Sequence, residues 1–192
     1  MKLDQWGIYR DNTASDSQDA CRLAGIMNAI RHPGAQWLLP FVTPTGEIMR
    51  HPHEHIYNIS RDQVVCFVAG YHFRLSQKAC KHDFSDRYKW RISKDIVSPS
   101  VYNHIRMCEG KPSTWLGRHW LTIDMWYNAK FCDANTEQNQ IIMLALVAGR
   151  LKEYCEMTPW WKESLRRYWG DRQEHEFVEY YIKYIEHLVT AT

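Results

Sequence analysis

The chain has 192 residues, of which 45% are hydrophobic, 24% are charged and 14% are aromatic. Nine Trp, eleven Tyr and six Phe residues exclude a disordered chain, because disordered segments contain few large apolar side chains. The 24 Lys and Arg residues nearly balance the 22 Asp and Glu residues, and the net charge of +2 argues against a dedicated nucleic-acid surface. No run of about 18 apolar residues occurs, so we expect no transmembrane helix and no membrane partner.

The cysteines and the first residues of the chain predict its compartment. The start lacks the apolar segment of a secretory signal, and six cysteines are spread at wide intervals without a C-x-x-C pair. We therefore expect a cytoplasmic protein with reduced thiols, and three disulfides in a secreted domain are the alternative. No glycine-rich phosphate loop is present, and we expect no cofactor.

Capping signals and helical spacing of apolar residues predict an all-α fold. Ser15 with Gln18 and Ser60 with Gln63 fit the capping box, in which each side chain satisfies a backbone amide at the helix start. Apolar side chains then recur every three or four residues. We predict one domain over 1–192, a compact bundle of about seven helices near 15–31, 60–78, 99–109, 113–131, 136–155, 159–169 and 172–189.

A long irregular connection separates the first two predicted helices. Residues 32–59 contain four prolines, which disfavour continuous helix or strand. A connection of this length is unusual in a compact domain and is often functional. We expect a short β-hairpin around residues 43–47 within it.

Polar residues gather around the first two predicted helix starts. If both starts lie at the same end of the bundle, which the connection 32–59 allows, the two groups face one cleft. Such a site would hold three carboxylates, two guanidinium groups and one imidazole, from Asp11, Asp16, Asp62, Arg22, Arg61 and His51.

This set of residues suits carbohydrate chemistry. Cleavage of a glycosidic bond uses two carboxylates of different pKa on either side of the sugar. We predict that Asp62 acts as general acid or base and that Asp16 or Asp11 is the second carboxylate. The polar ligand or glycan would be held by Arg22, Arg61 and His51 and would stack on Trp6, Tyr9 and Tyr57. Alternatively, these acids only stabilise the first turns of their helices, where a negative charge meets the helix dipole.

The run from His51 to His55 alternates imidazoles along the chain. Alternate residues of an extended segment point the same way, so His53 and His55 could share a metal ion. The spacing is not that of a helical H-E-x-x-H site, and further ligands would have to come from elsewhere. We therefore predict an exposed polar loop and no metal site.

A second function class is a small accessory protein that binds another protein and catalyses nothing. Exposed aromatic and arginine side chains would anchor the partner, and segments 84–91 and 159–169 carry the best candidates. Basic and aromatic residues also alternate around 84–91, but nearby Asp residues favour a solvated loop over a nucleic-acid site.

The polar segments in the first third of the chain also resemble segments of known protein families. The order Asp16-Ser17, Arg22, Gly25, then Arg50-His51-Pro52, then Ser60-Arg61-Asp62-Gln63 resembles a set of uncharacterised phage and bacterial proteins, over residues 6–70. The last segment is also similar to inner-helix ends of (α/α) toroid glycan-processing proteins. A complete toroid needs more helices than this chain can form. The resemblance implies that one site unites Asp16, Arg22, His51, Arg61 and Asp62.

Overall fold

The computed structural model describes residues 1–10, 20–43, 48–54, 61–74, 103, 106, 112, 114–131 and 136–191. Within these ranges it contains seven α-helices and one two-stranded antiparallel sheet, which confirms the predicted all-α fold. No helix in this part of the chain is long and apolar enough to span a bilayer.

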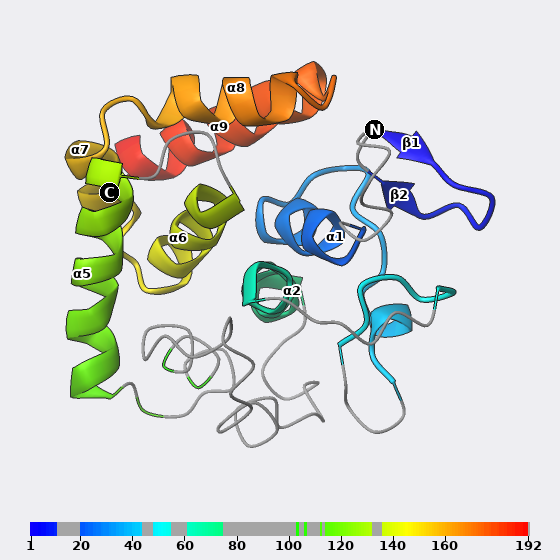
Figure 1. Ribbon diagram of the computed structural model, residues 1–192, viewed down its shortest axis with the longest axis horizontal. Helices are drawn as coiled ribbons and strands as arrows, with labels where there is room; N and C mark the ends of the chain where they lie inside the picture. The colour runs from blue at the N-terminus through cyan, green and yellow to red at the C-terminus, as the bar shows by residue number, and fades with distance from the viewer. Residues whose placement is uncertain are drawn as a thin grey trace.

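Figure 1 shows the elements in chain order. The N-terminal hairpin pairs β1 (Lys2–Leu3) with β2 (Tyr9–Arg10). The first half then contributes α1 (Ala20–Ala29), the 3-10 helix η1 (Leu39–Phe41) and α2 (Arg61–Arg74). The second half contributes α5 (Trp115–Phe131), α6 (Thr136–Val147), α7 (Leu151–Met157), α8 (Trp161–Gly170) and α9 (His175–Thr190).

The predicted helix over 136–155 is wrong in one respect, because it is two helices. The chain turns at Gly149, whose φ of 67° is left-handed. There the Gly149 amide donates to the Leu146 carbonyl and the Arg150 amide to the Ala145 carbonyl, the two hydrogen bonds of a Schellman motif. The spacing of apolar residues does not reveal where α6 ends, because the helices before and after Gly149 both bury one side in the same core.

Helices α1 and α2 pack against each other more closely than any other pair of elements. A Cβ atom at Gly25 would lie 2.6 Å from the backbone nitrogen of Phe67, and one at Gly70 would lie 2.9 Å from the Cα of Gly25. Both distances are too short for real carbon contacts. The two backbones therefore touch, and every residue of α1 is buried.

Helix α6 lies beside α2 and joins it to the second half of the chain. Its buried amide side chains hold α8. Gln138 accepts a hydrogen bond from the Ser164 hydroxyl at 2.8 Å and donates to the Trp161 carbonyl at 3.1 Å. Asn139 accepts from the indole of the fully buried Trp169 at 3.3 Å. The predicted buried position of this helix is confirmed.

The connection over 32–59 is irregular where it is described. An isolated antiparallel bridge between Val42 and Ile48 encloses the predicted hairpin turn, and 44–47 lie outside the described residues. The buried Asn28 side chain donates to the carbonyls of Ala24 and Gln36, which ties the connection to α1.

Substitution of Gly25 by alanine is expected to lower the free energy of unfolding by about 2–4 kcal/mol, because backbone of α2 must move to admit the methyl group. Urea unfolding measures this change. Gly170→Ala is the matched control. Its Cβ would be 3.6 Å from the His175 ring, an ordinary contact, and we expect it to leave stability unchanged or raised. Equal effects of both substitutions would contradict the close approach.

Candidate functional site

The N-terminal hairpin is held by a polar network around Asp4. Its Oδ1 accepts the backbone amides of Trp6 at 2.8 Å and Ile8 at 2.9 Å, which shapes the turn between the strands. Its Oδ2 accepts Arg10 Nε at 2.9 Å and His51 Nε2 at 2.7 Å. One carboxylate thus satisfies four donors and joins the hairpin to the loop at 48–54.

His51 is fully buried within this network. Its Nδ1 accepts the backbone amides of His53 and Glu54, both at 3.2 Å, so the proton resides on Nε2 and is donated to Asp4. Arg10 continues the network through an ion pair with Glu54. Both ring nitrogens of His51 therefore have protein partners.

The ionisation of the network follows from these contacts. Burial by itself raises the pKa of Asp4, but the hydrogen bonds from Ile8, Trp6, His51 and Arg10 outweigh it and hold that pKa at about 2. Burial lowers the pKa of His51 despite the adjacent carboxylate. The stable arrangement at neutral pH is an ionised Asp4 beside a neutral imidazole.

The structure brings together some of the predicted ligand-binding residues. Trp6 is 41% exposed, and its ring lies 5.3 Å from His51 and stacks on His53 at 5.4 Å between centroids. Tyr9 is half-buried in β2, and its amide donates to the Gln36 side chain at 2.9 Å. Trp6, Tyr9 and His51 therefore belong to one end of the molecule.

Arg22 lies at the start of α1, buried against α8. Its guanidinium carbon is 5.6 Å from the centroid of the Tyr168 ring, and the residue is 1% exposed. The amide of the preceding Cys21 donates to the Arg50 carbonyl at 3.0 Å, so α1 does begin beside the segment that carries His51. Most residues of the two predicted polar groups lie outside the described residues, so the shared cleft stays a prediction.

The structure does not describe the side chains of the predicted carboxylate pair, Asp62 with Asp16 or Asp11. Asp11, Asp16 and Tyr57 lie outside the described residues, and at Arg61 and Asp62 only the backbone is described, at the first turn of α2. The roles assigned to these residues stay predictions.

Sequence reasoning missed Asp4, which organises the whole network. A recognisable signal was present, since an Asp two residues before an aromatic and three before Gly7 is typical of a turn in which the side chain caps the backbone. Gly7 has a φ of 75° and completes that turn. The sequence could not show that the second oxygen of Asp4 would reach His51, 47 residues later.

The histidine run and the cysteines have structural roles where they are described. His51 contacts Asp4, and His53 stacks on Trp6. Among the described residues no group of three or more metal-ligating side chains occurs. Cys21, Cys66 and Cys155 are thiols and not disulfides, and burial raises the pKa of Cys155 to about 12, so that thiol is not a reactive nucleophile.

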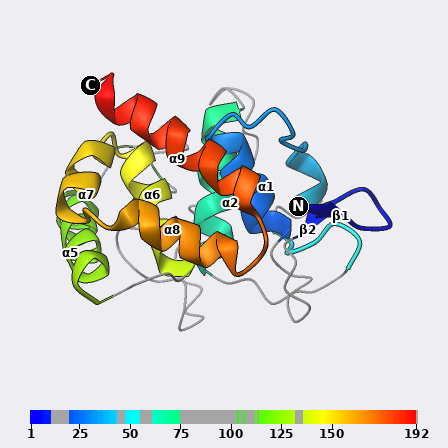
Figure 2. The same ribbon diagram turned by 90° about the horizontal axis from the view of Figure 1, so that it is seen from above.

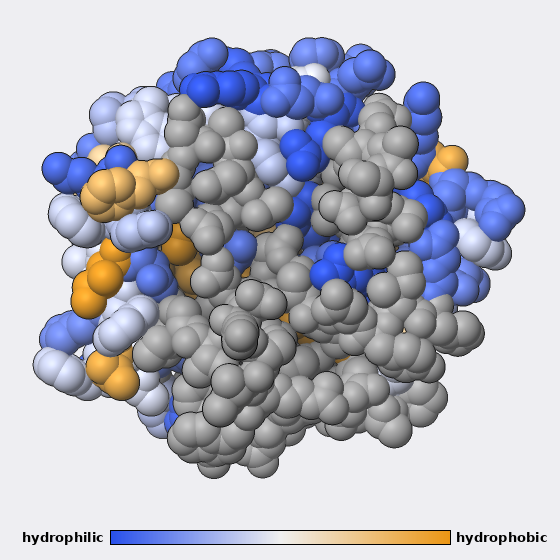
Figure 3. All heavy atoms as spheres, viewed as in Figure 1, coloured by the Kyte–Doolittle hydropathy of each residue, from blue (hydrophilic) through white to orange (hydrophobic). Residues whose placement is uncertain are grey.

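One face of α5 carries a second candidate site. The helix buries Leu121, Met125 and Asn128 against α6 and α7. The opposite face exposes seven large apolar side chains, each between 39% and 65% exposed: Trp115, Leu116, Trp120, Ile123, Trp126, Tyr127 and Phe131. We call these seven residues the α5 face. Figure 3 shows hydrophobic side chains along the edge of the molecule where α5 lies.

Large exposed aromatic side chains lie on α5 and not where segment 159–169 was predicted to present them. In segment 159–169, Trp161 and Trp169 are 5% and 0% exposed, so they pack α8 into the core and cannot anchor a partner. Segment 84–91 lies outside the described residues. Figure 2 places α5 and the N-terminal hairpin at opposite ends of the molecule, so the two candidate sites are separate.

Comparisons of the chain with protein-family models, with curated proteins and with solved structures find no match. The geometry of the two candidate sites is therefore the basis for a functional proposal.

Replacement of Asp4 by asparagine is expected to cost about 2 kcal/mol of unfolding free energy at pH 7, from the lowered pKa of the carboxyl. A depressed carboxyl pKa contributes stability above the ordinary value of 3.8, and that contribution disappears as the pH falls toward about 2. Urea unfolding at pH 7, 4 and 2.5 should show the two proteins converging in acid.

The exposed Asp171 provides the control for this experiment, because its replacement by asparagine removes the same charge outside the network. A constant gap between wild type and the Asp4 variant across the pH range would contradict the network's electrostatic role.

Proposed function

We propose that this protein is a binding module that recognises another protein through the α5 face. The observation that supports this proposal is the exposure of seven large apolar side chains on one side of a helix whose other side is packed into the core. Side chains of this size bury about 200 Å² each, so half-exposed they leave roughly 600–700 Å² of apolar surface. This exceeds the patches of ordinary monomers and approaches one side of a standard protein interface.

The composition of the α5 face is that of binding hot spots. Three Trp and one Tyr are among its members, and these side chains dominate measured interface energies. Five of its residues recur at positions 116, 120, 123, 127 and 131, which a helix places along one line. Over the 17 residues of α5, this line is about 25 Å long, enough to accommodate a partner helix of similar length.

The charges around the α5 face indicate the chemistry of the partner. Lys130 lies 5.8 Å from the centroid of Trp126, and His119 packs edge-on against Trp115 at 4.2 Å. The single carboxylate of α5, Asp124, is half-buried at the border of the face. An amphipathic helix with an apolar stripe and acidic flanks therefore complements this surface.

Self-association through the same face is less favourable. A two-fold pairing of α5 with a second copy would bring two sets of basic residues together, and no acidic residue on the face would meet them. The partner is accordingly a different protein.

A pair of designed peptides tests the proposal. Both are 18-residue amphipathic helices with leucine on one face, and their flanking positions are all glutamate in one and all lysine in the other. Fluorescence anisotropy of the labelled peptides should show about tenfold tighter binding of the glutamate peptide, because its charges complement the basic residues. Equal affinities would contradict the predicted partner chemistry.

A triple variant locates the binding site. Trp120→Gln, Ile123→Ser and Trp126→Gln together remove the centre of the α5 face, and we expect the glutamate peptide to bind at least about tenfold more weakly. The thermal midpoint should stay close to that of wild type, because all three side chains are exposed. Trp37→Gln is the control, since Trp37 is 52% exposed but lies in the connection before η1.

Two further measurements define outcomes that would overturn the proposal. A homodimer in sedimentation velocity that the triple variant dissociates would identify a second copy as the occupant. Binding to vesicles of anionic phospholipid, lost in the triple variant and without any peptide binding, would identify a membrane surface.

A further inference from the structure

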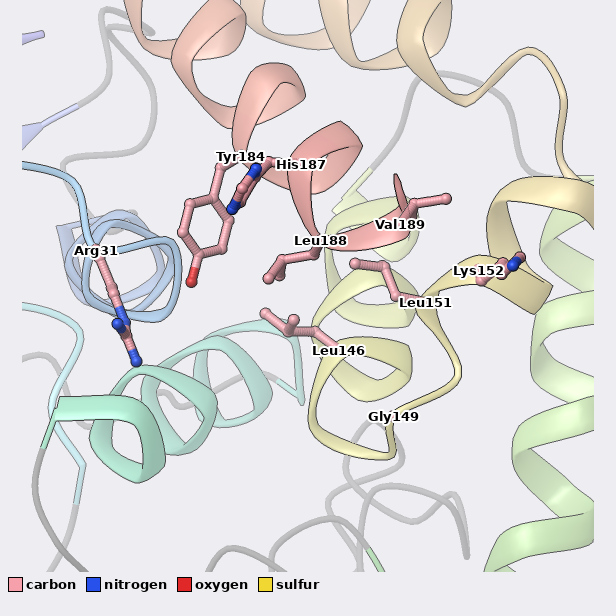
Figure 4. A pocket seen from close by; sticks show the side chains of 9 residues that line it. All are labelled: Arg31, Leu146, Gly149, Leu151, Lys152, Tyr184, His187, Leu188 and Val189. Carbon is pink, nitrogen blue, oxygen red and sulfur yellow. The ribbon is translucent and has the colours of Figure 1, made fainter. Parts of the chain in front are cut away.

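A cavity of about 580 Å³ lies where the C-terminal ends of α1, α6 and α9 meet the start of α7. Figure 4 shows the side chains that line it. Its volume is in the range of small-molecule sites, which is about 300–1,000 Å³. It is lined by residues of neither the N-terminal network nor the α5 face, so it is a third and independent feature of the molecule.

The lining combines leucine side chains with the polar side chains of Arg31, Tyr184, His187 and Lys152, of which Figure 4 shows Lys152 beside Leu151, away from Arg31. Leu146, Leu151 and Leu188 form the apolar part, and Figure 4 shows their side chains converging between α6 and α9. Arg31 and Tyr184 occupy the opposite side, where the phenol oxygen and the guanidinium group point toward the same space. No lining residue of the cavity, within the described chain, carries a carboxylate.

The two polar groups can act as donors to one anion. Burial raises the pKa of Tyr184, so its hydroxyl keeps its proton at neutral pH. The Arg31 guanidinium offers a planar pair of N–H donors, which matches a carboxylate. Arg31 forms no ion pair with any described acidic residue.

The backbone at Arg31 supplies a second, independent observation. Arg31 closes α1 in a Schellman motif, in which its amide donates to the Asn28 carbonyl and the His32 amide to the Met27 carbonyl. Its φ of 54° is left-handed, a conformation that this position of the motif ordinarily reserves for glycine. The end of α6 uses Gly149 at the equivalent position of its own motif, on another edge of the same cavity. The turn that ends α1 therefore places an arginine, and not a glycine, at the edge of the cavity.

We propose that this cavity binds an amphipathic monoanion with a single apolar chain, of the class of medium-chain carboxylates. The ligand's hydrocarbon chain lies against Leu146, Leu151 and Leu188, and its carboxylate lies between the Arg31 guanidinium and the Tyr184 hydroxyl. The leucines provide the apolar contact, and the two donors select an anion over a neutral or cationic head group.

The protein offers a well-matched pair of variants for testing the role of Arg31. Gln173 is the second non-glycine residue with positive φ, at 57°, and it ends α8 in the same motif, with Gln173 donating to Gly170 and Glu174 to Trp169. Both Arg31 and Gln173 are exposed. Arg31→Gly and Gln173→Gly therefore relieve the same backbone conformation, and only the first removes a cavity side chain. Both should keep a thermal midpoint at or above that of wild type.

Isothermal titration calorimetry with dodecanoate, below its micelle concentration at pH 8, tests the proposal. Wild type and Gln173→Gly should bind one equivalent with the same affinity, and Arg31→Gly should bind about three- to tenfold more weakly, because an exposed charge-assisted contact is lost. Leu188→Glu, which places a carboxylate on the apolar side, should abolish binding. Dodecanol and dodecylamine should bind more weakly than dodecanoate.

The results that overturn the proposal are distinct from those that concern the α5 face. Dodecanoate binding that is lost in the α5 triple variant and retained in Arg31→Gly would place the fatty chain on the α5 face and not in the cavity. Absence of binding by the folded wild-type protein, or equal binding of the three head groups, would also overturn it. Peptide binding by the α5 face is unaffected by any of these outcomes.

Discussion

The direct contact between the backbones of α1 and α2 is the constraint on which the rest of the structure depends. Glycine at positions 25 and 70 allows each helix to approach the main chain of the other, and no other residue type leaves room there. Other helices cover this pair: α6 packs on α2, and α8 covers the start of α1 at Arg22. The fixed position of α1 then determines where both its ends lie. Its start meets the loop at Arg50, and its C-terminal Schellman motif presents Arg31 to the cavity.

Polar groups in this protein serve architecture before they serve any ligand. Asp4, Arg10 and His51 resemble the components of a reactive centre, yet the imidazole is buried with both nitrogens engaged, and the carboxylate already accepts four hydrogen bonds. The amides on α6 also serve the fold, because Gln138 and Asn139 hold helix α8 in place, although the Asn139 Nδ2 atom has no hydrogen-bond partner among the described residues. In an interior of low dielectric, polar groups are most stable when they are paired, and the pairing of Asp4 and His51 leaves these two groups little capacity for a ligand.

The features that are left for binding are those that folding does not need. The seven side chains of the α5 face remain 39% to 65% exposed, and exposed apolar side chains of this size lower solubility. Arg31 occupies a backbone position at which glycine would be easier to accommodate. We propose both features as recognition surfaces, one for an extended helix and one for a small amphipathic anion. They lie on different elements, so one molecule can present both.

The sequence by itself determined the helical class, most helix positions and the burial of α6, because spacing of apolar residues and capping are local properties of the chain. The sequence only allowed the start of α1 to lie beside the segment that carries His51, and the tertiary contact between Cys21 and Arg50 decided it. Only the tertiary structure decided that the helix predicted over 136–155 divides at Gly149, that Trp161 and Trp169 are buried while the tryptophans of α5 are exposed, and that Asp4 reaches His51. Which side of an aromatic helix faces the core depends on the neighbours that cover it, and a pattern within one helix does not contain that information.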